Sequence, residues 1–244
     1  MRRMMWVDPP KTRIAQSAWV LRDKIVRGEL KPGERLVEQQ VAPLLSISRA
    51  SVREVLRLLE AERLIDWEPN CGYTVSALDD KEVRGIHEVW ALLTGQSVYD
   101  FTRRATPADI EPLLALPDQI RAKAKDKLKL IELINRLFND ISDKCDNGPL
   151  RDVVWGLVAR INVLRARCLN ETVARQWADE FDELLVACKE GQAVRARALV
   201  RQHIDGACEL ALAHSSQMRA NEPLTTMVRP ARAEKVVKKT RRSA

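Results

Sequence analysis

The sequence contains no long uninterrupted apolar segment. A membrane-spanning helix needs about 18 or more consecutive apolar residues, and no run of that length occurs in the chain. The first residues, MRRMMWVDPPKTR, place Asp8 and two prolines where a signal peptide would need its apolar stretch. We therefore expect a cytoplasmic protein that does not enter a membrane.

Cysteine pairs and the usual catalytic groupings are also missing. No two cysteines form a Cys-x-x-Cys pair, so neither a zinc site nor a disulfide framework is indicated, and we expect small core residues instead. The sequence has no Gly-rich phosphate loop, no Ser/His/Asp set tied by spacing and no paired carboxylates with a histidine. It therefore predicts a protein that is not an enzyme. The cysteines are Cys71, Cys145, Cys168, Cys188 and Cys208.

The positive charge is concentrated at the two ends of the chain. The net charge is +7, yet residues 76–218 carry 20 Lys or Arg against 22 Asp or Glu. Residues 1–75 carry 13 against 10, and residues 219–244 carry eight against two. Such a balance is typical of a polyanion partner such as DNA, although surplus lysine on a solvated tail looks the same.

The N-terminal part of the chain has the pattern of three helices followed by a hairpin. Apolar residues at helical spacing predict a first helix over 11–27 and a second over 37–45. A third helix begins at Ser48, whose hydroxyl can cap the free N–H groups. Two β-like runs, 64–67 and 73–75, are separated by Pro-Asn-Cys-Gly. Together these elements predict a winged helix-turn-helix over residues 11–76, after an extension of residues 1–10.

The rest of the chain shows only helical periodicity. Six antiparallel helices would form a bundle over residues 79–216 whose interior offers a ligand cavity. The tail, residues 221–244, is basic and lacks an apolar face, so we expect disorder there, with either phosphate contacts or mere solubility as its role. The expected helices span residues 79–103, 107–122, 127–145, 148–169, 172–189 and 192–216.

Four consecutive motifs between residues 28 and 75 carry a family resemblance. They are GELKPGERL, SRASVREVL, LLEAERLI and PNCGYTV, in this order. With this order and spacing, the segment resembles the winged helix of the GntR family of transcription regulators. The resemblance implies that the helix opened by Ser48 enters the major groove of double-stranded DNA.

The start of that third helix supplies the expected DNA contacts. Arg49 and Arg53 could each bond guanine O6 and N7 or neutralise a backbone phosphate. The alternative is that the two arginines, one turn apart, form only a solvated basic stripe. The resemblance implies that the DNA-binding residues are Ser48, Arg49, Ala50, Ser51 and Arg53, with Gly72 at the wing tip approaching the minor groove.

Three positions depart from the family pattern in this region. Pro43 falls inside the second helix, where it removes a hydrogen bond unless it lies in the first turn, so that helix starts late or bends. Ser51 stands where the family commonly has proline. Cys71 stands where a wing arginine or histidine is common.

Residues 79–216 resemble the FadR-type (FCD) effector domain, an all-helical bundle that binds organic acids in many members. The matching stretches are NRLFNDISDKCDNGPLRDVV and EFDELLVACKEGQAVRARALVRQHI. Many relatives hold a divalent metal there through one aspartate and three histidines. Those four positions are Asn135, Asn139, Phe181 and His203 here, so we expect a cavity without metal or cofactor.

The same positions remain candidates for the lining of an effector pocket. Asn135 and Asn139 lie one turn apart on one helix face, so their amides could bracket a polar ligand together with His203. A lone histidine is also common as a satisfied core group. An arginine and a glutamate often found on the first effector helix are replaced by Trp90 and Thr94. The expected pocket residues are Trp90, Asn135, Asn139, Phe181 and His203.

The sequence therefore predicts a mainly α fold, with an N-terminal winged helix-turn-helix and a C-terminal all-α helical-bundle effector domain. Since one recognition helix covers only a few base pairs, we expect a homodimer on a palindromic operator. A small-molecule effector, an organic acid or another metabolite, would modulate its DNA affinity. The alternative is a regulator whose C-terminal domain has lost ligand sensing and serves dimerisation or protein partner binding.

Overall fold

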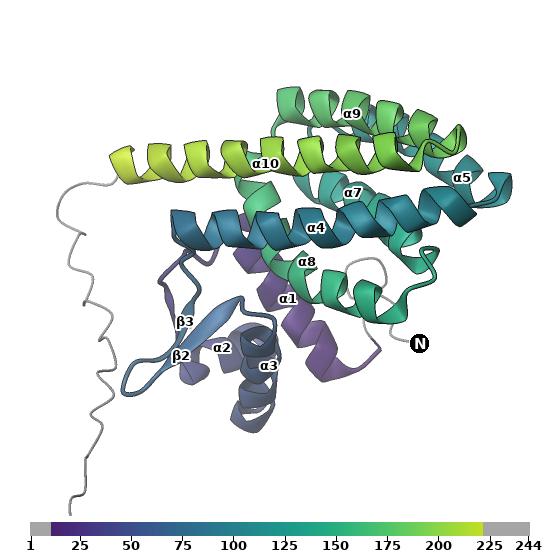
Figure 1. Cartoon of the computed structure of the whole chain (residues 1–244). Coiled ribbons are helices and arrows are strands. Elements are labelled where there is room, and N and C mark those ends of the chain that lie inside the picture. The colour runs from purple at the N-terminus through teal and green to yellow at the C-terminus, as the bar shows by residue number, and fades with distance from the viewer. Residues whose placement is uncertain (1–10, 222–244) are drawn as a thin grey trace, which may run out of the picture.

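The computed structural model describes residues 11–221, which form a small mixed head and a larger helical bundle (Figure 1). The N-terminal extension and the basic tail beyond Asn221 lie outside the described residues. The head consists of α1 (Arg13–Arg27), β1 (Arg35–Leu36), α2 (Glu38–Leu45), α3 (Arg49–Ala61), β2 (Ile65–Glu68) and β3 (Gly72–Val75). The bundle consists of α4 (Asp80–Arg104), α5 (Pro107–Leu114), α6 (Leu116–Ala122), α7 (Lys127–Asp143), α8 (Gly148–Cys168), α9 (Glu171–Lys189) and α10 (Ala193–Asn221).

The small sheet of the head has β3 at its centre. Both β1 and β2 pair with β3 in antiparallel register, with Arg35 opposite Thr74 and Trp67 opposite Tyr73. The predicted hairpin is thus present as β2 and β3. The strand β1 was not predicted, because two residues are too short to show the alternation that marks a strand.

The apolar faces of α1 and α3 form the core of the head. Leu21 of α1 packs in the same cluster as Val52, Leu56 and Leu59 of α3, and none of these side chains has exposed surface. Burial of each such side chain contributes about 1.5–3 kcal/mol. The expectation for the second helix was a late start or a bend at Pro43. The late start is wrong, because the helix begins at Glu38, and it ends two residues after that proline.

An ion pair with a buried guanidinium ties the first helix to the end of the third. The Arg22 side chain has no exposed surface, and its Nε donates to Glu62 Oε2 at 2.7 Å. Its Nη2 donates to the other oxygen of the same carboxylate. Glu62 directly follows α3, so the pair fixes the C-terminal end of α3 against α1.

The bundle contains one more helix than the sequence predicts. The expected helix over 107–122 is wrong, since α5 ends at Leu114 and α6 starts at Leu116. Pro117 explains the break, because in one continuous helix its ring would clash with the carbonyl oxygen of Leu113. Between Ser76 and Asn221 the described chain has no strand, as expected.

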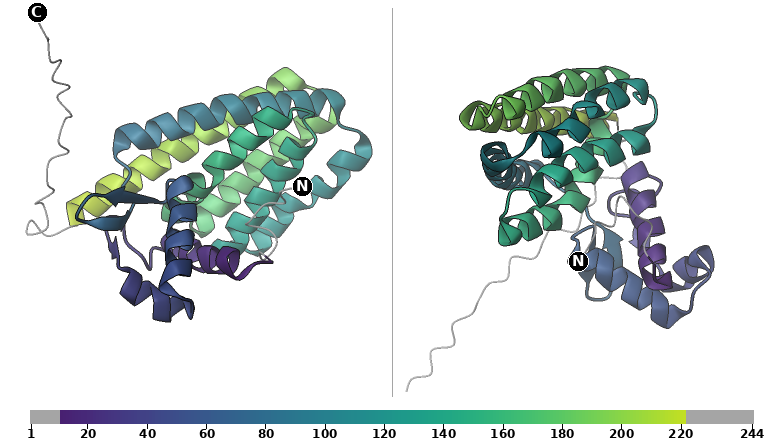
Figure 2. Two further views of the ribbon diagram at one scale, coloured as in Figure 1. Left: turned by 90° about the horizontal axis from the view of Figure 1, so that it is seen from below. Right: turned by 90° about the vertical axis from the view of Figure 1, so that its right-hand side faces the viewer.

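The two longest helices of the bundle, α4 and α10, run antiparallel and side by side (Figures 1 and 2). Near one end Arg84 pairs with Glu209 at 2.9 Å. Near the other, a Cβ on Gly95 would lie 3.3 Å from Arg197 Cγ, so glycine permits a close approach there. The helix α10 continues to Asn221, past the expected end at residue 216.

The head contacts the bundle through its first helix. One side of α1 packs on α3 and another on α8, so α1 belongs to both parts of the molecule (Figure 1). The apolar cluster accordingly runs without a break from the head into the bundle.

All five cysteines are free thiols. Four are buried, as expected of small core residues, whereas Cys71 in the hairpin turn is exposed and so is not a core residue. Within residues 11–221, every helix is too short or too polar to cross a lipid bilayer.

Candidate functional site

The third helix begins with a serine cap on the molecular surface. Ser48 precedes α3 in an extended conformation, and its Oγ accepts from the backbone N–H of Ser51 at 3.2 Å. The two hydroxyl oxygens lie 3.0 Å apart. This cap satisfies one of the helix N–H groups that otherwise lack partners, and it fixes the direction in which the first turn of α3 points.

The first two turns of α3 present polar side chains to solvent. Arg49, Ala50 and Arg53 are exposed and Ser51 is half-buried. The opposite face of the helix is entirely buried in the head. Because that buried face anchors α3, the exposed face is presented as a rigid surface, as the sequence predicts for a recognition helix.

Arg53 is held by a carboxylate of the preceding helix. Its Nε lies 2.9 and 3.0 Å from the two carboxylate oxygens of Glu38 on α2. The hydrogen bond to Glu38 raises the pKa of Arg53 further above its ordinary value. The pair orients the guanidinium while leaving its side chain largely exposed.

Gly72 lies at the base of the hairpin turn rather than at its tip. It is the first residue of β3, opposite Glu68, and has φ of +79°. The turn itself contains Pro69, Asn70 and Cys71, and the Cys71 N–H donates to the Glu68 carbonyl at 3.2 Å. The positive φ explains why glycine stands at position 72.

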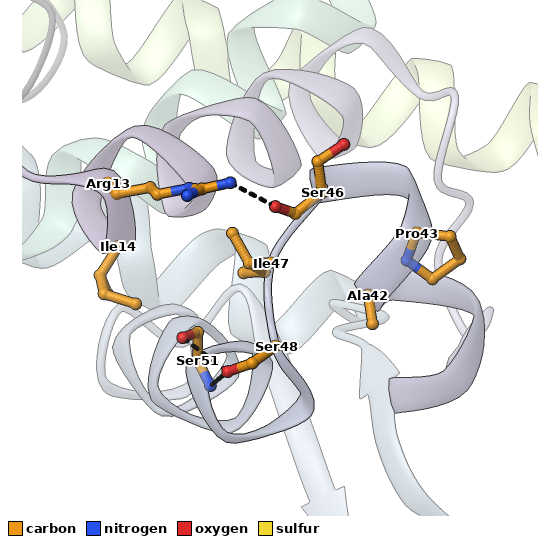
Figure 3. A pocket seen from close by; sticks show the side chains of 8 residues that line it. All are labelled: Arg13, Ile14, Ala42, Pro43, Ser46, Ile47, Ser48 and Ser51. Carbon is orange, nitrogen blue, oxygen red and sulfur yellow. Dashed lines mark hydrogen bonds between the residues drawn. The ribbon is translucent and has the colours of Figure 1, made fainter.

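A surface hollow of about 680 Å³ opens beside the start of α3, between α1 and α2 (Figure 3). In Figure 3 the Arg13 guanidinium donates to the Ser46 carbonyl, and Ser48 and Ser51 lie together at the first turn of α3. The hollow therefore brings a cation from α1 next to the recognition helix.

A second polar cluster lies inside the bundle, where the sequence predicts the effector pocket. Asn135 on α7 accepts at Oδ1 from Nη1 of Arg165 on α8, at 2.8 Å. The same Nη1 lies 3.1 Å from Oδ1 of Asn162. All three side chains are buried. Asn139, one turn after Asn135, is also buried, and its Nδ2 has no hydrogen-bond partner among the described residues.

Aromatic rings surround this polar cluster. The Arg165 guanidinium carbon lies 4.7 Å from the ring centre of Trp90 and 5.5 Å from that of Phe138. The His203 ring lies 4.7 Å from Phe181 and 5.0 Å from the Trp177 ring. Positions from five helices, α4 and α7 to α10, thus meet around one point of the bundle core.

His203 is buried and bonded to a carboxylate. Its Nδ1 lies 2.6 Å from Glu180 Oε2, and burial lowers the pKa of the imidazole although Glu180 acts to raise it. At neutral pH the ring is therefore neutral, with Nδ1–H donating to Glu180. The Nε2 atom is then a bare acceptor, and it has no partner among the described residues.

The structure brings four of the five expected pocket residues together through two shared neighbours, Arg165 and Phe138. Trp90 and Asn135 both contact Arg165, and Phe181 packs on His203. Arg165 and Asn162 were missed by the sequence analysis. No local sequence pattern distinguishes them from solvated polar residues, and only the burial of the second half of α8 reveals them.

These residues do not fit a divalent metal. The four positions that hold metal in many relatives offer two amides, a phenyl ring and one imidazole. The oxygen of Asn135 already accepts from the cationic Arg165, whose charge would repel a metal ion. No group of three or more His, Cys, Asp or Glu suited to a metal occurs in the described part of the chain.

Two family matches cover most of the chain. Residues 14–75 match the family described as bacterial regulatory proteins, gntR family, and residues 85–206 match the FCD domain. The uncharacterized HTH-type transcriptional regulator YdhC of Bacillus subtilis (strain 168) is 28% identical over 218 residues, covering 83% of this chain and 92% of its own. The gluconate operon transcriptional repressor of the same strain is 32% identical over 136 residues, covering 56% and 54%.

Solved structures show the same fold. The structure of E. coli McbR/YncC superimposes with a TM-score of 0.73 at 19% identity, covering 84% of this chain and 100% of that one. A winged head with an exposed basic helix, joined to an all-helical bundle, defines a DNA-binding regulator. The chain belongs to the GntR family of bacterial regulatory proteins, in the FadR-type subfamily with an FCD domain. It is a DNA-binding transcriptional regulator, and the named relatives are regulators rather than enzymes.

Proposed function

We propose that this regulator binds a palindromic DNA operator as a homodimer, and that a small molecule in the bundle core changes its affinity for that operator. The observation that carries the DNA half is the exposed face of α3, where Arg49 and Arg53 stand on a helix whose other face is buried. A helix of this kind fits the major groove, and its first turns reach the base edges.

Each candidate contact has a distinct role in this proposal. Arg49, which is exposed, and Arg53, which Glu38 orients, donate to guanine O6 and N7 or to phosphate. Ser48 and Ser51 lie at the positive end of the helix, where a backbone phosphate is favoured. Ala50 offers a small apolar contact, and Gly72, at the base of the hairpin turn, permits the backbone conformation that carries this turn to the minor groove.

The homodimer follows from the size of one head. A single recognition helix covers only a few base pairs, which rarely supplies enough affinity against the many competing sites of a genome. Two heads related by twofold symmetry bind two half-sites, so the operator carries the same symmetry.

The effector half of the proposal depends on the polar cluster in the bundle core. Buried amides, a buried imidazole and a buried guanidinium retain polar atoms without partners among the described residues. Unpaired polar atoms are costly in a protein interior, so a ligand that pairs with them is favoured. The second candidate, a bundle that serves only dimerisation or partner binding, is favoured by the replaced metal positions.

Selection of bound fragments from random duplex DNA tests the DNA half. The recovered site should be palindromic, and Arg49→Glu and Arg53→Glu should each weaken binding to it at least tenfold. Arg175→Glu is the matched control, since Arg175 is exposed on α9, far from α3, and the change in charge is the same. Lack of preference for any duplex over a polyanionic competitor, or full binding by both α3 variants, would contradict the proposal.

Thermal-shift screening separates the two candidates for the bundle. A ligand that binds the native state raises the melting temperature, so at least one acid, sugar acid or amino-acid derivative should do so and change operator affinity. If none of them binds, the bundle serves assembly alone.

A further inference from the structure

Arg165 is a buried cation without a buried anion. Its side chain is almost fully enclosed, at 4% exposure, and no carboxylate in the described part of the chain forms an ion pair with it. The carboxylate of Glu180, which is partly exposed, is bonded to His203 instead. Burial lowers the pKa of Arg165 to about 9, so the guanidinium still carries its charge at neutral pH.

Retention of this charge opposes the stability of the fold. Removing an ion from water costs several kcal/mol in a protein interior unless an opposite charge and hydrogen bonds compensate. Two amide oxygens, on Asn135 and Asn162, compensate at Nη1 only. The Nε atom of the same guanidinium has no hydrogen-bond partner within the described residues. One edge of the group is therefore satisfied and the other is not.

The shape of the surroundings restricts what can satisfy the second edge. The rings of Trp90 and Phe138 lie within 4.7 and 5.5 Å of the guanidinium carbon, so they occupy space beside the planar group. A partner therefore approaches in the plane of the guanidinium, at the Nε edge. A planar carboxylate makes two parallel hydrogen bonds to such an edge.

The remaining unpaired atoms of the core extend this pattern. Nδ2 of Asn135 and Nδ2 of Asn139 are buried donors without partners, and Oγ1 of Thr94 is a buried hydroxyl without one. Nε2 of His203 is a buried acceptor. Three donors of this set suit an anionic oxygen, and the imidazole suits a hydroxyl group.

We propose that Arg165 is the anchor of the effector site: its guanidinium binds the carboxylate of a small organic acid directly, with Asn135 and Asn139 donating to the same ligand. This deepens the proposed effector function and rests on it. The guanidinium here supplies the positive charge that a metal ion supplies in many relatives. Ligand binding consequently needs no metal.

Matched pairs of small ligands test the charge requirement. Acetate, lactate and malonate are titrated by calorimetry beside acetamide, lactamide and malonamide, and inorganic phosphate is included as a tetrahedral anion. At least one acid should bind at least tenfold more tightly than its amide, and EDTA should not change that ratio. Equal binding of acid and amide, binding of phosphate alone, or no binding by any acid would overturn the proposal.

Three variants test the residue. Arg165→Met keeps an unbranched chain but removes the charge, and Arg165→Lys keeps the charge but removes the Nε edge. Both should weaken binding of the preferred acid at least tenfold. Arg151→Met is the matched control, because Arg151 lies on the same helix over the ring of Trp155 but near the surface. Unchanged acid binding by both Arg165 variants would overturn the proposal. If neither variant folds, the ratio of acid affinity to amide affinity in the unaltered protein decides the question.

Operator binding, measured on the same samples, keeps the two proposals separate. If an acid binds through Arg165 but leaves operator affinity unchanged, the site stands and the effector function fails. If a neutral ligand binds the bundle and shifts operator affinity, the effector function stands and the carboxylate site fails.

Discussion

Arg53 of α3 and Glu38 of α2 face each other across the turn of the helix-turn-helix motif, with the Arg53 Nε 2.9 and 3.0 Å from the two carboxylate oxygens. The pair connects the two helices of the motif. These bonds involve Nε alone and leave most of the Arg53 side chain exposed for the proposed DNA contact.

Removal of the Glu38 carboxylate should therefore change DNA selectivity more than stability. Exposed ion pairs contribute little to folding, so Glu38→Gln should melt at nearly the same temperature as the unaltered protein. The released guanidinium contacts phosphates in any sequence, so the ratio of operator to non-specific affinity should fall about tenfold, equivalent to about 1.4 kcal/mol. Fluorescence anisotropy with operator and scrambled duplexes measures it, and an unchanged ratio would show that Glu38 does not orient Arg53.

The buried ion pair of the head should behave differently. Glu62→Gln removes the carboxylate charge that pairs with the fully enclosed Arg22 guanidinium, so it should lower the free energy of unfolding by about 3 kcal/mol. Arg27→Gln is the control, since Arg27 pairs with Asp23 on the surface of the same domain and its loss should cost less than about 1 kcal/mol. Urea denaturation measures both, and similar values for the two variants would contradict the burial argument.

Ser48 combines a structural and a DNA-binding role that two substitutions can separate. Ser48→Ala removes the cap and should cost about 1 kcal/mol of stability. Ser48→Asp keeps a capping oxygen and should retain stability, yet its charge repels phosphate and should weaken operator binding at least tenfold. Should the aspartate variant bind the operator normally, the start of α3 does not lie close to the DNA backbone.

Two buried histidines should make the protein less stable in mild acid. Burial lowers the pKa values of both His87 and His203, whereas in the unfolded chain histidine titrates at about 6.5. Between these values the unfolded state binds more protons, so stability is full above about pH 6.5 and falls as the pH decreases. Each histidine contributes a slope of at most about 1.4 kcal/mol per pH unit. Denaturation between pH 7.5 and 5 should show this slope, and His87→Gln and His203→Gln should each reduce it.

Metal ions should have no role in the bundle. Elemental analysis of the purified protein should find no stoichiometric zinc, nickel or manganese, because the four positions that hold metal in many relatives supply one imidazole here and lie beside the Arg165 cation. EDTA should leave the melting temperature unchanged. A bound metal that disappears in His203→Ala would contradict this prediction.

Much of the fold follows from periodicity and capping residues in the sequence. Ser48, with the apolar positions one turn apart behind it, predicted α3 and its cap correctly. The strand β1 was not predicted, because Arg35 and Leu36 form a strand only by pairing with β3, which lies far along the chain. The break at Pro117 was overlooked, although a proline within a helical pattern is itself a signal of a helix end.

The proposed DNA contacts could be predicted from the sequence better than the polar cluster in the bundle core. Five of the six proposed DNA contacts fall within residues 48–53, so their spacing alone places them at the start of one helix. The bundle cluster combines residues from five helices, and its centre, Arg165, has no local pattern that distinguishes it from a solvated arginine. Only the packing of α8 against α4 and α7 shows that this side chain is enclosed.

The position of α8 has a consequence for operator architecture. This helix of 21 residues carries Arg165 near one end and supports α1 of the head, and at about 1.5 Å per residue it acts as a rod roughly 30 Å long. A slight tilt of the rod around a bound ligand would displace each head of the proposed dimer and alter the separation of the two recognition helices. Two operators whose half-site spacings differ by one base pair should then show opposite changes in affinity when the same ligand binds.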